Sequence, residues 1–300
     1  SNAINGTQSS VFRIPANEVG GSGEYTIAPT SLLPTISDAV VLDGTTQTGF
    51  GGTPIIELDG TGAGAGQNGL TMTASNSTVR GFVINRFGGH GIRISGGANN
   101  VIAGNYIGTD VLGAADLGNN FMGVELGLGS TNNQIGGTAA ADRNVISGNN
   151  QNGVSMIGGS NNNSIVGNYI GVNAAGTGPV ANSLSGVAID GANTITIGGT
   201  AAGARNVISG NTQQGIWMNN STGSIIQGNY IGTNANGDAA VANGGFGIVL
   251  EAAVSNVQIG GNSAAARNVI AANTQDGIFL NGADNNTIQG NYIGTDVHGS

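Results

Sequence analysis

The sequence predicts an all-β fold, a right-handed parallel β-helix, in which about nine or ten coils of three short strands stack into a solenoid. Three observations lead to this prediction. Motifs return at fixed intervals, apolar residues alternate with polar ones over short stretches, and no stretch of about ten residues has the spacing of an amphipathic helix. A unit of strands without helices can bury its apolar side chains only by stacking on the next copy.

The repeat has a long and a short interval. RNVISGN stands at 143–149 and 205–211, and RNVIAAN stands at 267–273, so each copy follows the last by 62 residues. A shorter series, from GIRI at 91–94 to GIFL at 277–280, returns every 29–33 residues. We therefore predict coils of mostly 29–33 residues in which two variants alternate.

Equivalent residues of stacked coils should lie above one another, about 4.8 Å apart for each coil. We expect one buried isoleucine stack and one asparagine stack at the turns, where side-chain amides can hydrogen-bond along the axis. The isoleucines are Ile146, Ile208 and Ile270, and the asparagines are Asn149, Asn211 and Asn273.

Three arginines, Arg143, Arg205 and Arg267, recur with the same 62-residue interval. They could form a row that binds anions. They could instead hold the preceding GGTAAxAR loop in place through backbone carbonyls. We favour the second interpretation as a structural stack, because each arginine accompanies a copy of the loop.

The composition excludes several classes of protein. The chain has 300 residues, no Cys, no Lys and a formal net charge of −9, so no nucleic-acid partner is expected. It has no run of about 18 apolar residues, so no membrane insertion is expected. No cofactor and no metal site are predicted, since the calcium-binding repeat GGxGxD is absent.

We divide the chain into three parts. Residues 1–3, Ser-Asn-Ala, look like an expression-tag remnant. Residues 4–68 are expected to form the N-terminal capping coils, and residues 69–300 the regular coils. The last motif, GNYIGTDVHGS, stops within a coil, so we expect the chain to be truncated from a longer protein.

The motifs resemble those of a known group. NNxIxGNYIGTD, IGGTAAxARNVISGN and LPTISDAVVLDGTTQTGFGGTPIIELDG are similar to right-handed parallel β-helix repeat proteins of the pectin lyase-like superfamily, in particular to segments of large secreted or surface-attached bacterial proteins. The resemblance runs from about Phe12 to Ser300. It implies an extracellular or cell-surface location as part of a larger secreted protein. The superfamily includes lyases, hydrolases, esterases, adhesins and spacers.

Enzymes of that superfamily usually work on an outer sheet face, so the outward residues of the GIxI strands are the candidate site. Two aromatic residues are expected two coils apart, about 10 Å, with amides and carboxylates beside them. Such a face suits carbohydrate binding, unless a loop or a neighbouring domain covers it. The candidates are Trp217, Phe279, Asn219, Asn281, Asp190 and Glu251.

Catalysis has weaker support in the sequence. Asp190 and Glu251 are expected at the edge of the separation, about 6.5–9.5 Å, that suits inverting glycoside hydrolysis. Adjacent Asp residues and Lys are absent, and the only histidines stand at positions 90 and 298. Arg93 and Glu125 are expected to form an exposed pair worth at most about 1 kcal/mol.

These observations favour a non-catalytic extracellular module, structural or adhesive, that can bind carbohydrate. Its partners would be a polysaccharide or cell-surface glycan and other domains of the parent protein. One alternative is a carbohydrate-active enzyme, a polysaccharide hydrolase or lyase, that acts on the face around Trp217. The second alternative is a pure spacer stalk.

Overall fold

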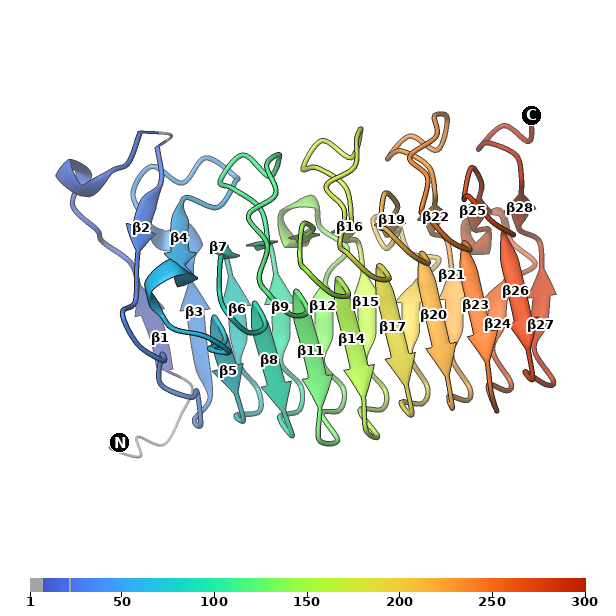
Figure 1. Ribbon diagram of the computed structural model, residues 1–300, viewed down its shortest axis with the longest axis horizontal. Coiled ribbons are helices and arrows are strands. Elements are labelled where there is room, and N and C mark those ends of the chain that lie inside the picture. The colour runs from blue at the N-terminus through green and yellow to red at the C-terminus, as the bar shows by residue number, and fades with distance from the viewer. Residues whose placement is uncertain (1–7, 22) are drawn as a thin grey trace.

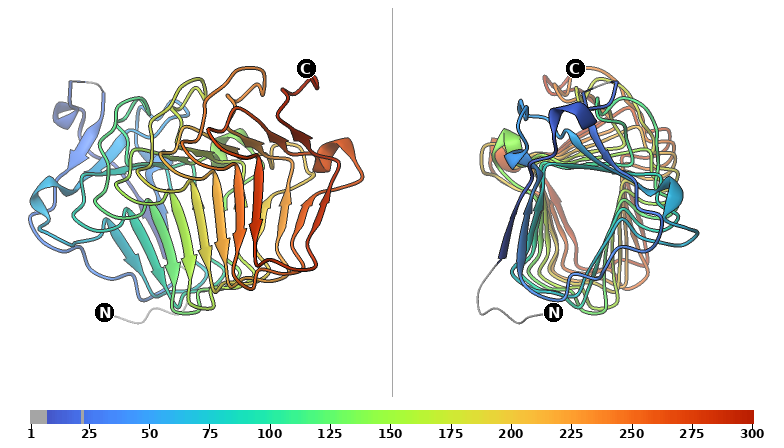
Figure 2. Two further views of the ribbon diagram at one scale, coloured as in Figure 1. Left: turned by 45° about the vertical axis from the view of Figure 1, so that its right-hand side comes forward. Right: turned by 90° about the vertical axis from the view of Figure 1, so that its left-hand side faces the viewer.

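The computed structural model describes residues 8–21 and 23–300, so the tag remnant expected at 1–3 lies outside the described residues. The described chain is a right-handed parallel β-helix whose coils stack along one axis (Figure 1). Three parallel sheets, called A, B and C here, form its sides (Figure 2). Sheets A and B have ten strands each and sheet C has eight, because the first and last coils of the described chain give no strand to sheet C. The predicted fold class is confirmed.

Sheet A contains β1 (Gln8–Val11), β3 (Val40–Asp43), β6 (Thr78–Arg80), β9 (Val101–Ala103), β12 (Gln134–Gly136), β15 (Ser164–Val166), β18 (Thr196–Gly198), β21 (Ile225–Gln227), β24 (Gln258–Gly260) and β27 (Thr287–Gln289). Sheet B contains β2 (Tyr25–Ile27), β4 (Ile56–Asp59), β7 (Phe82–Asn85), β10 (Tyr106–Ile107), β13 (Val145–Ile146), β16 (Tyr169–Ile170), β19 (Val207–Ile208), β22 (Tyr230–Ile231), β25 (Val269–Ile270) and β28 (Tyr292–Ile293). Sheet C contains β5 (Leu70–Met72), β8 (Ile92–Ser95), β11 (Val124–Gly127), β14 (Val154–Ile157), β17 (Val187–Asp190), β20 (Ile216–Asn219), β23 (Ile248–Glu251) and β26 (Ile278–Asn281).

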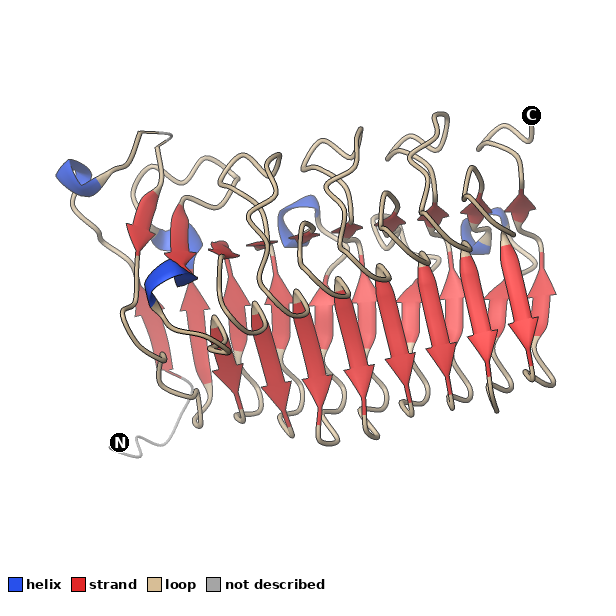
Figure 3. Ribbon diagram, viewed as in Figure 1, coloured by secondary structure: helices blue, strands red, loops and turns tan. Residues whose placement is uncertain are grey.

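Short 3-10 helices and loops lie outside the three sheets (Figure 3). The helices are η1 (Ala16–Glu18), η2 (Gly44–Thr46), η3 (Gly60–Gly62), η4 (Ala140–Asp142) and η5 (Ala264–Ala266). The loops that lead from sheet B to sheet C protrude along one edge of the solenoid. In the part of the chain that the structure describes, no helix has the length and apolar character needed to cross a membrane.

Stacked isoleucines fill the interior beneath sheet B. Ile146, Ile208 and Ile270 alternate there with Ile170 and Ile231, and all five side chains are fully buried. Alternation along a strand places every second residue inside, which is why the apolar pattern has a period of two.

The glycine of the GIxI motif follows from the same packing. A Cβ added at Gly215 would lie 2.7 Å from Cγ2 of Ile231 and 2.7 Å from the carbonyl oxygen of Gly247. Only glycine therefore lets the chain approach the isoleucine stack at this corner.

Asparagine side chains form buried ladders along the axis. One ladder consists of Asn119, Asn149, Asn182, Asn211, Asn243 and Asn273, and each Nδ2 donates to Oδ1 of the next residue at 2.8–3.0 Å. Asn182 and Asn243 come from the other coil variant and occupy the gaps between the asparagines of the RNVISGN coils. A second ladder consists of Asn105, Asn144, Asn168, Asn206, Asn229, Asn268 and Asn291. The ladders satisfy polar groups that the turns would otherwise leave unpaired in the interior.

Breaking one ladder should destabilise the fold measurably. In Asn211→Ala, Asn182 loses its acceptor at 3.0 Å and Asn243 loses its donor at 2.9 Å. We expect the free energy of unfolding to fall by about 1–3 kcal/mol, because each of these buried groups loses one of its hydrogen bonds and the alanine leaves a gap in the ladder. Denaturant unfolding would measure the loss. Asn150→Ala is the control, since Asn150 bonds Asn120 at an exposed position and its loss should cost under about 0.5 kcal/mol. Equal losses in both variants would contradict the role of the buried ladder.

Candidate functional site

The outer face of sheet C carries one side chain from each coil at the same register position. Along the sheet these residues are Thr71, Arg93, Glu125, Ser155, Ala188, Trp217, Val249 and Phe279. A second row, two residues further along the strands, includes Asp190, Asn219, Glu251 and Asn281. We call these two rows the sheet C face. Strand alternation directs all of these side chains away from the isoleucine core.

A hollow of about 230 Å³ lies on this face beside Trp217. Ala188, one coil before Trp217, has too small a side chain to fill the space, and Leu184 and four polar residues from the adjoining turns form the rest of the lining. Among them, Asn152 accepts a hydrogen bond from the backbone of Ser185, whose hydroxyl donates to Gln214. The hollow therefore combines one indole wall with fixed amide groups, which is the composition of a small polar-ligand site.

The structure places the two candidate carboxylates against side-chain donors. Nε1 of Trp217 donates to Oε2 of Glu251 at 2.8 Å, and Nδ2 of Asn219 donates to Oδ1 of Asp190 at 2.9 Å. Neither carboxylate lines the hollow. Glu251 therefore holds the indole ring in its orientation, and Asp190 does the same for the amide of Asn219.

Phe279, two coils beyond Trp217, packs against another aromatic ring. Its ring lies 4.7 Å from that of Phe246 at an interplanar angle of 20°, so the two rings are stacked. Val249 lies between Trp217 and Phe279 in the sheet and is buried. Asn281 is exposed at the end of the same strand as Phe279. The aromatic part of the sheet C face thus continues past Trp217 as a packed patch.

A buried cluster of charged side chains lies at the other end of the sheet C face. The sequence analysis expected Arg93 and Glu125 to form an exposed pair, and this is wrong, because Glu125 is only 5% exposed. Nε of Arg93 lies 2.8 Å from Oε1 of Glu125, and Nε2 of His90 lies 3.5 Å from Oε2. The contact between Arg93 and Glu125 is an ion pair whose geometry is not that of a hydrogen bond. The ring of Phe121 lies 5.3 Å from that of His90 and helps to cover the cluster.

Burial sets the protonation of His90. It lowers the pKa of the imidazole below its ordinary value; Glu125 opposes this shift and Arg93 adds to it. The imidazole is therefore neutral at pH 7 and can accept a proton. Its Nδ1 is buried without a hydrogen-bond partner among the described residues. The Arg93 side chain is 39% exposed and is the part of the cluster that a ligand would meet.

Sequence reasoning missed this cluster as a site. A signal was present: Arg93 and Glu125 occupy the same position in adjacent GIxI strands, and His90 precedes the first of them by three residues. What it did not contain was the cover provided by Phe121, which stands at a turn position whose residue differs from coil to coil. In the described part of the chain, no group of three His, Cys, Asp or Glu side chains is placed to hold a metal ion.

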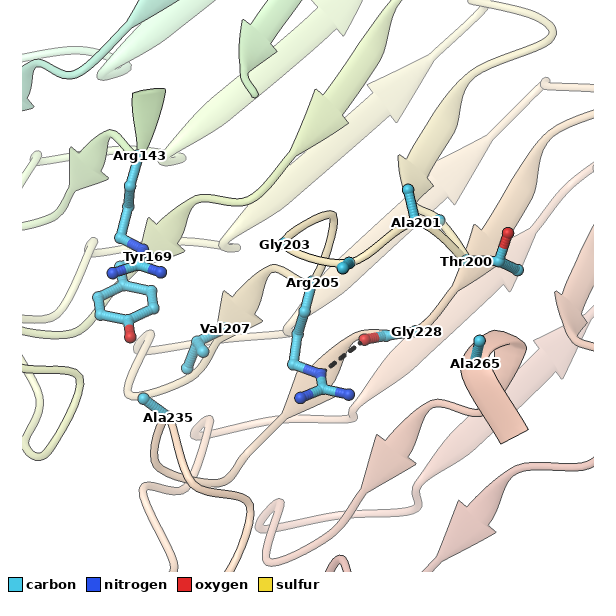
Figure 4. A pocket seen from close by; sticks show the side chains of 12 residues that line it. Arg143, Tyr169, Thr200, Ala201, Gly203, Arg205, Val207, Gly228, Ala235 and Ala265 are labelled. Carbon is cyan, nitrogen blue, oxygen red and sulfur yellow. Dashed lines mark hydrogen bonds between the residues drawn. The ribbon is translucent and has the colours of Figure 1, made fainter. Parts of the chain in front are cut away.

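The recurrent arginines lie on the outside of sheet B. The guanidinium groups of Arg143, Arg205 and Arg267 stack over the rings of a tyrosine from the next coil, at 4.2, 4.0 and 4.1 Å. Nε of Arg205 also donates to the carbonyl oxygen of Gly228 at 3.0 Å, as Figure 4 shows. Arg267 bonds Gly290 in the same way, at 3.1 Å. The carbonyls come from the following GNYIG segments, so these arginines tie neighbouring coils together.

Comparison with known proteins shows the fold. No protein-family model matches the chain, and no curated protein matches it. A double mutant of the periplasmic alginate epimerase AlgG has a similar structure, with a TM-score of 0.55, 13% identity, and 84% of this chain and 51% of that chain covered. The A-module of the mannuronan C-5 epimerase AlgE4 from Azotobacter vinelandii has a TM-score of 0.41 and 14% identity, with 95% and 88% covered. Pectate lyase Pel9A has a TM-score of 0.38 and 14% identity, with 96% and 70% covered. The chain thus spans about half the length of AlgG.

These comparisons correct the functional expectation. The similar structure with the TM-score of 0.55 is an alginate epimerase, a carbohydrate-active enzyme. This contradicts the expected non-catalytic structural or adhesive module and agrees better with the enzyme alternative. Identity of 13% supports the β-helix fold and no particular reaction.

Proposed function

We propose that the chain is a carbohydrate-active enzyme that binds a polysaccharide along the sheet C face and acts on it there. One observation carries the proposal: the hollow beside Trp217 and the cluster of His90, Arg93 and Glu125 lie on the same outer face. The likeness to an alginate epimerase supports a polysaccharide as the substrate class. That epimerase is periplasmic, which supports a location outside the cytoplasm.

In this proposal the hollow binds one sugar residue of the chain. The indole of Trp217 would stack on the apolar face of the sugar ring, and its bond to Glu251 fixes the indole before the sugar arrives. The amides of Asn152 and Gln214 would bond the sugar hydroxyls. Arg93 lies four coils from Trp217, about 19 Å along the axis, so a bound oligosaccharide would extend from one to the other.

The cluster favours elimination over hydrolysis. Hydrolysis uses two carboxylates on either side of the glycosidic bond, and Asp190 and Glu251 are each engaged with a side-chain donor. Arg93, which its ion pair with Glu125 orients and whose side chain is 39% exposed, would bind the carboxylate of an acidic sugar. The neutral imidazole of His90 would take the proton next to that carboxylate, which requires the bound sugar to displace Phe121 from the buried imidazole. The electron pair would form a carbon–carbon double bond as the glycosidic bond breaks, and the leaving oxygen would take a proton from solvent.

A product assay tests this function. The protein would be incubated with acidic and neutral polysaccharides, and mass spectrometry would detect released oligosaccharides. Elimination products lack the water that hydrolysis adds. We expect products from an acidic polysaccharide, and Trp217→Ala should raise KM about tenfold through lost stacking, worth about 1.4 kcal/mol. Trp217→Phe is the matched control, since it retains a ring. An absence of products across the panel would overturn the enzyme proposal. An unchanged KM in Trp217→Ala would show that the polysaccharide does not bind at Trp217.

A further inference from the structure

A second cavity lies on the outside of sheet B, away from the sheet C face. It has a volume of about 470 Å³, and Arg143 and Arg205 line it together with the ring of Tyr169 (Figure 4). Glycine and alanine residues form most of the remaining wall. A smaller hollow of about 260 Å³ shares Arg143 and adds Arg80 and Tyr106. The two hollows therefore follow one another along the axis of the solenoid.

The charge of this surface is opposite to that of the protein. The chain has 16 acidic and seven basic residues, yet no acidic residue lines either hollow. Arg80, Arg86 and Arg93 each form an ion pair with a carboxylate. Arg143 and Arg205 form none among the described residues. A concave wall with uncompensated guanidinium groups attracts anions.

The hydrogen bonding of these arginines is incomplete. Nε of Arg143 is buried and has no partner in the part of the chain that the structure describes. Nε of Arg205 donates a hydrogen bond to the carbonyl oxygen of Gly228, and this bond holds the guanidinium at the cavity wall. The two terminal nitrogens take no part in that bond (Figure 4). Stacking on tyrosine fixes both guanidinium planes in advance, so less side-chain entropy is lost when an anion binds. The arginines thus serve two purposes, because they join coils and they present donors.

We propose that this cavity binds an acidic oligosaccharide, with sugar carboxylates on Arg143 and Arg205. The two arginines lie two coils apart, about 10 Å along the axis, so the ligand they match is a linear polymer with a repeating negative charge. The small side chains of the wall leave the space open for such a strand. Nucleic acid is disfavoured by the net charge of −9. The site lies on a different sheet from the proposed enzyme site, and the inference does not depend on that function.

Calorimetry with a hexasaccharide of galacturonic acid, at low and high salt, tests the proposal. We expect binding that weakens with salt, and a loss of at least tenfold in affinity in Arg205→Gln. Ala202→Glu should weaken binding as much, because it places a carboxylate at an exposed position on the rim and leaves the arginine ties between coils intact. Ala252→Glu is the control for added charge, since Ala252 is exposed and lines neither hollow.

Three results would overturn the proposal. The first is unchanged affinity in both Arg205→Gln and Ala202→Glu. The second is binding of the hexasaccharide that disappears in Trp217→Ala, because the ligand would then occupy the sheet C face. The third is inorganic phosphate binding as tightly as the hexasaccharide, which would make the cavity a site for single anions. Product release in the assay above is independent of all three, so the two proposals can fail separately.

Discussion

Ile208→Asp will unfold the coils on either side of β19. Ile208 is fully buried between Ile170 and Ile231 in the stack beneath sheet B. An aspartate there would place an unpaired charge in an apolar interior, which costs several kcal/mol or forces the carboxyl to remain protonated. Each coil is stabilised by its two neighbours, so the damage spreads along the solenoid. We expect the loss of a cooperative melting transition for this region, followed by circular dichroism and limited proteolysis.

Two variants separate burial from other effects of that substitution. Ile208→Val removes one methylene and should cost about 0.5–1.5 kcal/mol. Ile225→Asp introduces the same charge on β21, where the native side chain is 37% exposed, and should leave the melting curve nearly unchanged. An unchanged curve for Ile208→Asp would show that this residue does not face the interior.

Glu125→Gln will abolish most of the proposed enzymatic activity while the fold is retained. The substitution keeps the size of the side chain and removes the charge between His90 and Arg93. Arg93 is then no longer oriented, and His90 loses the group that raises the pKa of its imidazole. We expect kcat on an acidic polysaccharide to fall by about 10²–10⁴, the usual contribution of a positioned acid–base group. The acid limb of the pH profile should also move to lower pH, because that pKa falls further.

Stability and charge controls make this result specific. The melting temperature of Glu125→Gln should stay close to that of the wild type, since a buried charge is removed and Arg93 can turn to solvent. Asp284→Asn removes one negative charge at an exposed position beyond β26 and should leave kcat unchanged. Full activity in Glu125→Gln would exclude the cluster from the mechanism. Asp190 and Glu251 would then be the candidate catalytic residues.

The fold could be predicted because its determinants recur. Every coil repeats the same apolar alternation, so the positions of Ile146 and Asn149 can be inferred from their copies. The first asparagine ladder could be predicted only at every second coil, because Asn182 and Asn243 stand in coils whose motifs differ from RNVISGN. The side chains of Asn182 and Asn243 occupy the equivalent turn position in the structure, although the residues that flank them differ.

The candidate site could be predicted only in outline. Trp217 lies on the outer face because alternation requires it, but its bond to Glu251 depends on rotamers that no spacing reveals. The burial of Glu125 depends on the residues of the turn beside it, and the residues between the recurring Asn and Gly of that turn differ from coil to coil. The tyrosine that stacks under each arginine comes from the following coil, a pairing that becomes visible only once the coils are stacked.

The alternation of arginine and tyrosine coils also restricts how a chain of this kind can change its length during evolution. Duplication of an arginine coil, or loss of a tyrosine coil, would bring two arginine coils together, and one guanidinium would lose its aromatic ring. Duplication of a tyrosine coil, or loss of an arginine coil, would bring two tyrosine coils together and break the alternation. The asparagine ladders would survive, because both coil variants contribute to them. Only a change of 62 residues preserves both features. Heritable length changes should therefore come in pairs of coils, which lengthen or shorten the solenoid in steps of about 10 Å.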